Sequence, residues 1–310
     1  MLLIALIVLA AVMIAFMAVF ITDLIKSHKS NKQKYHKSEV IMALVFLLPA
    51  SIMMFFFVIL PIFMSLGYSF TDYDLMRPEK IGIAGDGFDN FRQLWKELKE
   101  HQPIYNALIN TTVFVLLVVP VQIGLALLLA LFVNNKMKGN TVFKVCFFAP
   151  VAISLSVTAY LWKQIIPSQA LKTDFVAMLW IVLLSAWQGC GFQMLIFLSA
   201  LGNIRKDLYE AARVDGANVF QRFWTVTVPG LRPTMLYILI TVFIGACRVM
   251  IQPMLLTGYQ TQTVTISYFM YKQGFDYYHV GYSCAIALVM TIFMGTITFL
   301  QRKLLGEKKK

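Results

Sequence analysis

The amino-acid sequence predicts an all-α polytopic membrane protein with seven membrane-spanning helices. The chain has 310 residues, of which 59% are hydrophobic and 14% charged, a composition typical of membrane proteins rather than soluble domains. Apolar segments of about 20 residues, the length that a helix needs to cross a bilayer, recur along the chain. Basic residues gather in clusters that alternate with loops of low net positive charge.

The apolar segments define the expected spans and a first division into domains. The longer segments can tilt or extend into the interface. We divide the chain into an N-terminal anchor helix with a basic linker, 1–39, and a membrane domain, 40–310. The seven expected spans are residues 2–22, 40–66, 108–133, 144–163, 175–200, 234–257 and 280–301.

The distribution of charge predicts the orientation in the membrane. Of the 27 basic residues, 18 fall in four clusters, at 26–37, 136–144, 205–232 and 302–310. The positive-inside rule places these clusters in the cytoplasm, with the N-terminus outside and the C-terminus inside. The first basic cluster follows the first span instead of preceding it, so that span is expected to be a retained anchor and not a signal peptide. The net charge of +12 therefore indicates a lipid bilayer and no nucleic-acid partner.

Two segments outside the spans are expected to form short helices. Residues 88–98 carry apolar side chains at helical spacing, which predicts an amphipathic helix at the outer interface, a depth that suits Trp95. A polar island between two spans predicts a cytoplasmic helix that ends at Gly216. Asp207 and Glu210 lie in its first turn, where negative charge is favoured.

The sequence contains no recognisable catalytic or metal-binding motif. It lacks a GxxxxGK[ST] phosphate loop, GxSxG and HExxH, so we expect no catalytic residue, no metal and no cofactor in this chain. The four cysteines fall within spans, which argues against a disulfide framework.

A family resemblance rests on the polar island. The run LYEAARVDGANVFQRFWTVTVPGLRP resembles the EAA loop of inner-membrane permease subunits of ABC importers, at about 201–233. FDNFRQLWKEL and NALINTTVF before it, and LLTGYQTQTVTISYFMYKQGF after it, extend the resemblance over roughly 40–305. Within the family the chain is most similar to carbohydrate importers of the maltose and glycerol-phosphate type, as the first of two unlike permeases.

The resemblance implies a six-helix permease core with one additional N-terminal helix, in the bacterial cytoplasmic membrane. It implies a second permease subunit as heterodimer partner, two cytoplasmic ATPase subunits that hydrolyse ATP with Mg, and an extracytoplasmic solute-binding protein. In such importers the EAA helix inserts into a cleft on the ATPase. The motif positions are Glu210, Ala211, Ala212, Asp215 and Gly216.

The resemblance also nominates residues for the translocation path. By the match of the Trp187-Gln188-Gly189 run, Ser185, Gln188, Gly189 and Phe192 would face the path; helix–helix hydrogen bonding and packing are the alternative.

Arg248 is expected about two thirds along the sixth span, either in the pathway or external gate or as an anchor at the outer interface. Gln252, one turn later, would share its environment.

The expected function is import of a sugar or oligosaccharide by ATP-driven alternating access. One alternative is an ABC importer of the same kind whose cargo is a polyamine, a phosphate or a phosphodiester, since related permeases share the EAA loop. Another class would be a membrane enzyme or stand-alone channel, which the missing catalytic constellation and the docking helix disfavour. A scaffold or sensor that has lost transport is a third alternative.

Overall fold

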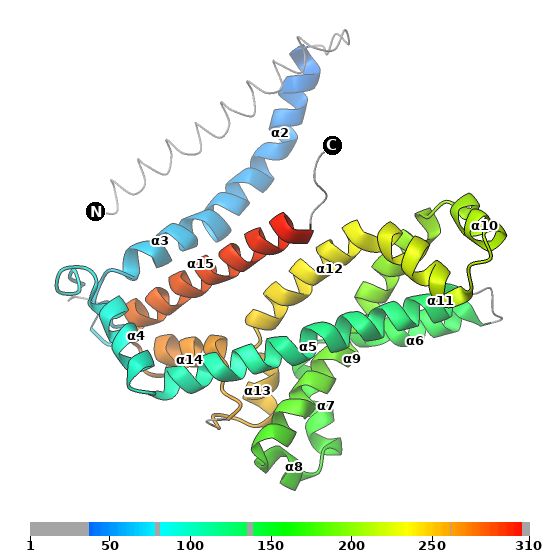
Figure 1. Cartoon of the computed structure of the whole chain (residues 1–310). Coiled ribbons are helices and arrows are strands. Elements are labelled where there is room, and N and C mark those ends of the chain that lie inside the picture. Colours follow the sequence, from blue (N-terminus) through cyan, green and yellow to red (C-terminus); the bar gives the residue numbers. More distant parts are fainter. Residues whose placement is uncertain (1–36, 78–80, 135–138, 261, 306–310) are drawn as a thin grey trace. The chain divides into compact units, whose positions relative to one another are not determined.

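The computed structural model describes residues 37–77, 81–134, 139–260 and 262–305 (Figure 1). The chain divides into two units, Met1–Tyr68 and Ser69–Lys310. The predicted first span, 2–22, lies outside the described residues. The predicted division into an N-terminal anchor with its basic linker, 1–39, and a membrane domain, 40–310, stays a prediction.

The described part of the first unit is one long apolar helical run. It comprises α2 (Lys37–Met54), the π-helical turn η1 (Phe55–Ile59) and α3 (Leu60–Tyr68). Its apolar stretch Phe46–Tyr68 is long enough to cross a membrane and coincides with the predicted second span.

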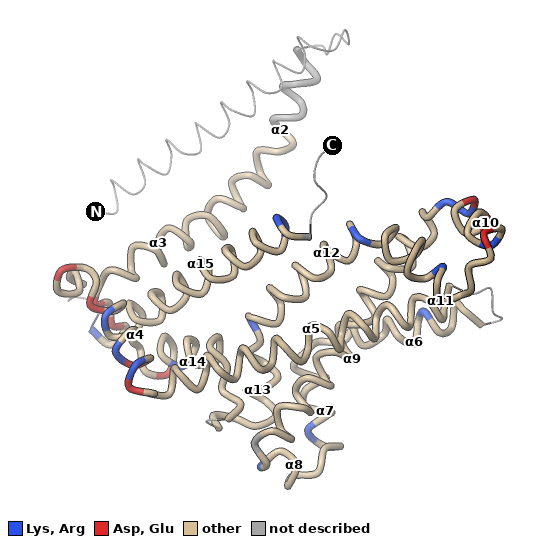
Figure 2. Tube along the Cα trace, in the orientation of Figure 1, with Lys and Arg blue, Asp and Glu red and all other residues tan. Residues whose placement is uncertain are grey.

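The second unit contains helices of very different lengths, and α4 and α10 lie at opposite ends of the long ones (Figure 1). Figure 2 shows that acidic and basic residues gather around α4 and α10, while the long helices between them carry few. The elements are α4 (Asp89–Lys99), α5 (Pro103–Asn134), α6 (Asn140–Ala152), α7 (Leu155–Ile165), α8 (Ser168–Lys172), α9 (Asp174–Asn203), α10 (Lys206–Val214), α11 (Val219–Arg222), η3 (Phe223–Thr227), α12 (Val228–Cys247), α13 (Ile251–Leu256), α14 (Ile266–Tyr271), η4 (Lys272–Asp276) and α15 (Val280–Leu305).

The prediction of an all-α polytopic membrane protein is confirmed. Among the described residues, five helices are long and apolar enough to span a membrane, and a bent pair brings the number to six. The amphipathic helix expected at 88–98 is α4, and the short helix of the polar island is α10.

The predicted fourth span, 144–163, consists of two helices in the structure. The chain breaks between α6 and α7, whose axes meet at 101°. Pro150 lies in the last turn of α6, where it removes a backbone donor, and Ile153 is extended. The Gln188 side chain on α9 donates to the Ile153 carbonyl (3.2 Å), which satisfies a backbone group that the break leaves without a helical partner.

The limits of the sixth span, predicted at 234–257, are wrong. Helix runs from Val219 through α12 and ends at Cys247, before a separate α13. Two hydroxyls satisfy carbonyls at this break: Thr265 donates to Val249 (2.6 Å) and Ser267 donates to Cys247 (3.2 Å). The segment between the sixth and seventh predicted spans is partly helical, as α14 and η4.

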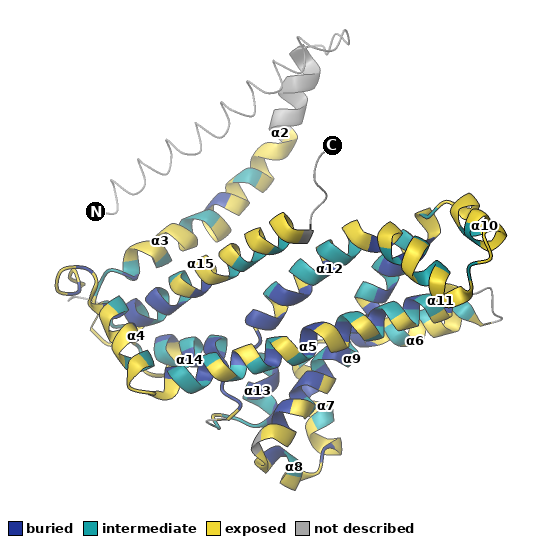
Figure 3. Ribbon diagram, viewed as in Figure 1, coloured by how far each residue is buried: buried dark blue, intermediate teal, exposed yellow. Residues whose placement is uncertain are grey.

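Buried residues concentrate where α5 and α9 pack together and against α12 (Figure 3). Phe114, Leu184 and Phe197 are among the largest side chains that are fully buried there. Gly191 brings α9 against α6, since a Cβ at this position would lie 2.1 Å from the Phe147 carbonyl oxygen. A glycine is therefore required at this contact.

Candidate functional site

Helix α10 has defined ends. The Arg205 guanidinium forms a salt bridge with Asp207 in the first turn, and this hydrogen-bonded pairing lowers the pKa of the Asp207 carboxyl below its ordinary value. At the other end Gly216 adopts φ +80°, and the Ala217 and Gly216 N–H groups donate to the Ala212 (2.9 Å) and Arg213 (3.1 Å) carbonyls. These two bonds form a Schellman motif, so the predicted role of Gly216 as the helix stop is confirmed.

The motif residues of α10 lie on an accessible helix. The structure describes α10 in full, and none of its residues is buried (Figure 3). Glu210 and Ala211 are exposed, and Ala212 is half-buried. Asp215 is the C-cap of the helix and is exposed. Such a helix gains little stability from packing within its own chain, and its surface is free to pack against another molecule.

Exposed apolar side chains lie on α10 and on the segment that follows it. Val214 is 88% exposed and Phe220 70% exposed, and Leu208, Val219 and Trp224 are also exposed. We call these five residues together with α10 the docking surface. Exposed apolar residues gathered around one polar helix are typical of a protein interaction site.

One side-chain hydrogen bond joins α10 to the base of a long helix. The hydroxyls of Tyr209 and buried Thr227 lie 3.0 Å apart. Thr227 ends the π-helical turn η3, which continues directly into α12. An Asn218–Gln221 capping box starts this helical run, which therefore begins well before Pro229 and Pro233.

A second feature is a cavity of about 180 Å³ inside the bundle, which we call the central pocket. Helices α5, α9, α12 and α13 line it with side chains that are polar but uncharged and with apolar ones. The polar residues that line it are Gln122, Ser185, Gln193, Thr241 and Gln252.

Hydrogen bonds fix some of these polar groups. The Gln122 amide donates to the Gln193 side-chain oxygen (3.2 Å), which joins α5 to α9. Ser185 donates to the Ile181 carbonyl (2.7 Å). Gln122 and Gln252 are buried. Amide and hydroxyl groups can both donate and accept, so the pocket is suited to a neutral solute with several hydroxyls.

The structure brings two of the six nominated path residues, Ser185 and Gln252, to the central pocket. Gln188 is directed to the α6–α7 break. Gly189 lies against the Gln122 side chain, since a Cβ there would be 2.2 Å from its nitrogen. Phe192 is exposed.

Arg248 is not inside a span, as the sequence suggested, but is the exposed C-cap of α12. The break after it separates it from buried Gln252, so the two do not share one helix.

The sequence reasoning missed Gln122, Gln193 and Thr241 as pocket residues. A usable signal was present, because an amide or hydroxyl within an apolar span usually faces a cavity or another helix. That signal does not tell which of the two applies. Only the packing of α5, α9 and α12 separates the pocket residues from the other polar residues of these spans.

Comparison with known proteins identifies the family. The model of the family described as "Binding-protein-dependent transport system inner membrane component" matches residues 100–309, which include the docking surface and the central pocket. The chain belongs to this family. It is therefore a multi-pass inner-membrane permease component of a binding-protein-dependent transport system.

Relatives of this permease share most of its length. The probable ABC transporter permease protein YesP of Bacillus subtilis is 31% identical over 293 residues, which cover 87% of this chain and 92% of YesP. The lactose transport system permease protein LacF of Rhizobium radiobacter is 28% identical, over 86% of this chain and 94% of LacF. The arabinooligosaccharides transport system permease protein AraP of Bacillus subtilis is 31% identical, over 66% of this chain and 72% of AraP.

A solved structure shares the fold of the permease. A chain in the crystal structure of a bacterial alginate ABC transporter, in complex with an alginate pentasaccharide-bound periplasmic protein, superposes with a TM-score of 0.70 at 20% identity. The match covers 86% of this permease and 94% of that chain.

Proposed function

We propose that this permease forms half of a transmembrane pathway that imports a sugar or oligosaccharide by ATP-driven alternating access. The main support for a carbohydrate cargo is the lining of the central pocket. Its lining residues, all in the described part of the chain, include no charged side chain. A polyamine or phosphate would bring a charge into this pocket without a partner there, which is costly. Hydroxyl groups would find amide and hydroxyl partners. The names of AraP and LacF agree with a carbohydrate cargo.

The proposed coupling runs through the docking surface. Glu210, Ala211, Ala212, Asp215 and Gly216 would contact a cytoplasmic ATPase subunit, with the alanines allowing close approach and Glu210 making a charged contact. The exposure of α10 and its hydrogen bond to Thr227 support this assignment. Movement of the ATPases would then shift α12 and change access to the central pocket.

The proposed assembly contains a second, unlike permease, two ATPase subunits that bind ATP and Mg, and an extracytoplasmic solute-binding protein. In this chain we propose seven spans with the N-terminus outside and the C-terminus inside, and a permease domain that begins near residue 40. The alternating basic clusters support this orientation. Ser185 and Gln252 are the nominated path residues that we retain as sugar contacts, joined by Gln122, Gln193 and Thr241.

The test is ATPase activity of the reconstituted complex with a panel of sugar-loaded binding proteins. We expect stimulation by one sugar or oligosaccharide, because only the loaded binding protein should favour the transition that closes the ATPases. Stimulation only by a non-carbohydrate solute would overturn the proposal of a carbohydrate cargo, while the proposal of an importer would stand. A complex that binds no ATPase would overturn the coupling role of α10.

A glycine substitution tests the central pocket. A Cβ at Gly245, which lines the pocket, would meet no atom within 4 Å, so Gly245→Leu is expected to fold and to narrow the cavity. Transport should fall by at least about 10-fold, because a single methylene too many in a binding pocket already costs about 10- to 200-fold. Uptake of radiolabelled sugar into proteoliposomes measures this loss.

The matched control is Gly295→Leu on α15, where a Cβ also meets open space but which does not line the pocket. This variant should transport at close to the unsubstituted rate. Equal rates for the Gly245 and Gly295 variants would remove the central pocket from the path.

A further inference from the structure

Helix α4 uses one face to pack on the rest of its unit. Leu94 and Asn90 are buried, and the Asn90 amide donates to the Ser69 (3.0 Å) and Thr71 (2.8 Å) carbonyls. The Tyr282 hydroxyl near the start of α15 donates to the Glu97 carboxylate (2.6 Å). These contacts hold α4 in place and leave a different face that the rest of the second unit does not cover.

The uncovered face combines aromatic and basic side chains. Trp95 is 63% exposed and Phe88 55% exposed. They border a hollow of about 470 Å³ together with Phe91, Arg92, Lys96, Lys99 and Glu100. We call this surface the aromatic–basic face.

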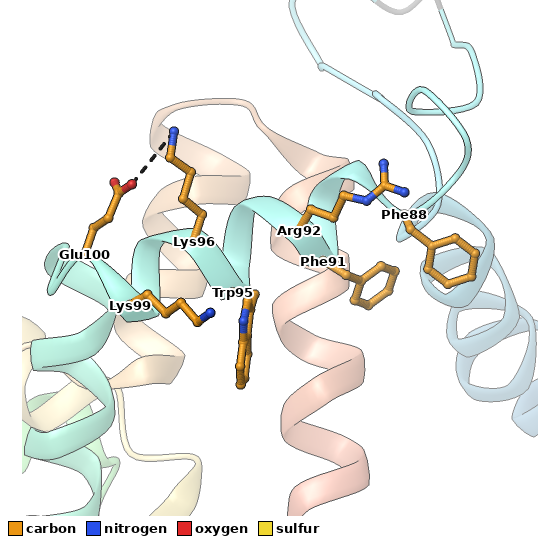
Figure 4. A pocket seen from close by; sticks show the side chains of 7 residues that line it. All are labelled: Phe88, Phe91, Arg92, Trp95, Lys96, Lys99 and Glu100. Atoms are coloured by element: carbon orange, nitrogen blue, oxygen red, sulfur yellow. Dashed lines mark ion pairs between the residues drawn. The ribbon is translucent and has the colours of Figure 1, made fainter.

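The rings and the Lys96 side chain lie on opposite sides of the helix, whereas Lys99 lies on the side of the rings (Figure 4). Figure 4 shows the rings of Phe91 and Trp95 on one side of the α4 ribbon and Lys96 with Glu100 on the opposite side. The rings point toward the side along which α15 runs away from α4 (Figure 4). Lys99 lies beside the rings, with its nitrogen 5.5 Å from the centre of the Trp95 ring.

The position of α4 places this face at a membrane edge. The spanning helix α5 begins at Pro103, directly after α4 ends at Lys99. The spanning helix α15 begins at Val280, and its Tyr282 is bonded to Glu97. Because α4 lies at the same end of two spans, its rings are at the depth where aromatic belts form in membrane proteins.

The lysines are the cations of this face that can reach an external anion. Arg92 is committed to salt bridges with Asp86 and Asp89 (3.2 Å). Lys96 lies 3.9 Å from Glu100, the limit of an ion pair, and its side chain is highly exposed. Lys99 is exposed and makes no salt bridge within the described residues.

We infer that the aromatic–basic face binds an anionic phospholipid, with Trp95 and Phe88 among the upper acyl chains and Lys96 and Lys99 on the phosphate. Aromatic rings on the membrane side of a helix, with cations beside and above them, are the pattern of an interfacial lipid contact. A soluble protein partner would approach from the aqueous side, away from the rings. The inference goes beyond the proposed transport function and does not depend on its cargo.

Quenching by brominated lipids tests the inference. The full chain is reconstituted in vesicles with brominated phosphatidylglycerol or brominated phosphatidylcholine, and the Trp95 signal is taken as the difference from a Trp95→Phe variant. We expect stronger quenching by the anionic lipid. In Lys96→Gln/Lys99→Gln the relative affinity for the anionic lipid should fall about 25-fold, since each basic residue near an anionic surface contributes about fivefold.

The matched control is Arg302→Gln/Lys303→Gln, which removes two exposed basic residues at the far end of α15. Selectivity at Trp95 should be unchanged in this variant. Equal quenching by the two lipids, or no quenching by either, would overturn the inference. Loss of lipid quenching when a binding protein is added would also overturn it, because the face would then dock a protein. None of these readouts uses ATPase activity, so failure here is distinguishable from failure of the transport proposal.

Discussion

Glu210→Lys is expected to abolish ATP-driven uptake while leaving the permease folded. Glu210 is exposed on a helix that buries none of its residues, so the core does not depend on it. In the proposed complex the new lysine would face groups that are complementary to a carboxylate. Losing one partner of a buried charge pair costs about 2–5 kcal/mol, which is roughly 30- to 5,000-fold in affinity for the ATPase.

Co-purification of the ATPase and ATP-dependent uptake measure the effect. Glu100→Lys provides the control, because it makes the same charge reversal at an exposed position beyond the end of α4, at the other end of the spans. That variant should keep its ATPase. Wild-type uptake and ATPase binding by Glu210→Lys would show that this carboxylate does not contribute to docking.

Gly191→Ala is expected to destabilise the permease, although it adds only one methyl group. The new Cβ would lie 2.1 Å from the Phe147 oxygen and 3.1 Å from the Phe148 Cα. Backbone atoms cannot rotate away as a side-chain tip can, so α6 and α9 must separate. Forced contacts in a packed core cost about 1–3 kcal/mol, and separation of the helices also removes contacts between them.

Gly202→Ala is the matched control, since a Cβ at this position of α9 meets nothing within 4 Å. Alanine favours a helix by about 1 kcal/mol over glycine, so this variant should be neutral or more stable. Thermal unfolding in detergent compares the two. Equal midpoints would mean that α6 and α9 tolerate a wider separation than the structure indicates.

Local signals explain what the sequence predicted well. The stop of α10 at Gly216 depends on one residue and its neighbours, because only a glycine adopts positive φ there without strain. The apolar spans are likewise visible in any window of the right length. Local sequence signals alone predict only a short helix at the surface around Glu210. Its expected contact with an ATPase came from the family motif.

The two broken helices show where sequence reasoning stops. Hydropathy continues across Val249 and Met250, so a window sees one span where the chain has a break. The hydroxyls that stabilise the break come from Thr265 and Ser267, which lie well beyond it in the sequence. Arg248 was misplaced for this reason.

Only two of the five polar residues of the central pocket were predicted, because the pocket forms only where four helices pack together. Ser185 was found from the family pattern and Gln252 from its spacing to Arg248, whereas Gln122 gains its place only by packing of α5 on α9. Gly189, nominated for the path, instead provides the room for the Gln122 side chain.

The Tyr209–Thr227 bond has a thermodynamic consequence. Thr227 lies at the base of α12, and Gly245 and Ala246 of the same helix line the central pocket. At 1.5 Å per residue these points are about 27 Å apart along one rod. If α12 shifts as a unit, binding of a solute in the pocket and binding of the ATPase to α10 are coupled by one free energy. Thermodynamic linkage requires this coupling to be the same in both directions. A bound sugar would then strengthen or weaken ATPase binding by the same factor by which the bound ATPase changes affinity for the sugar.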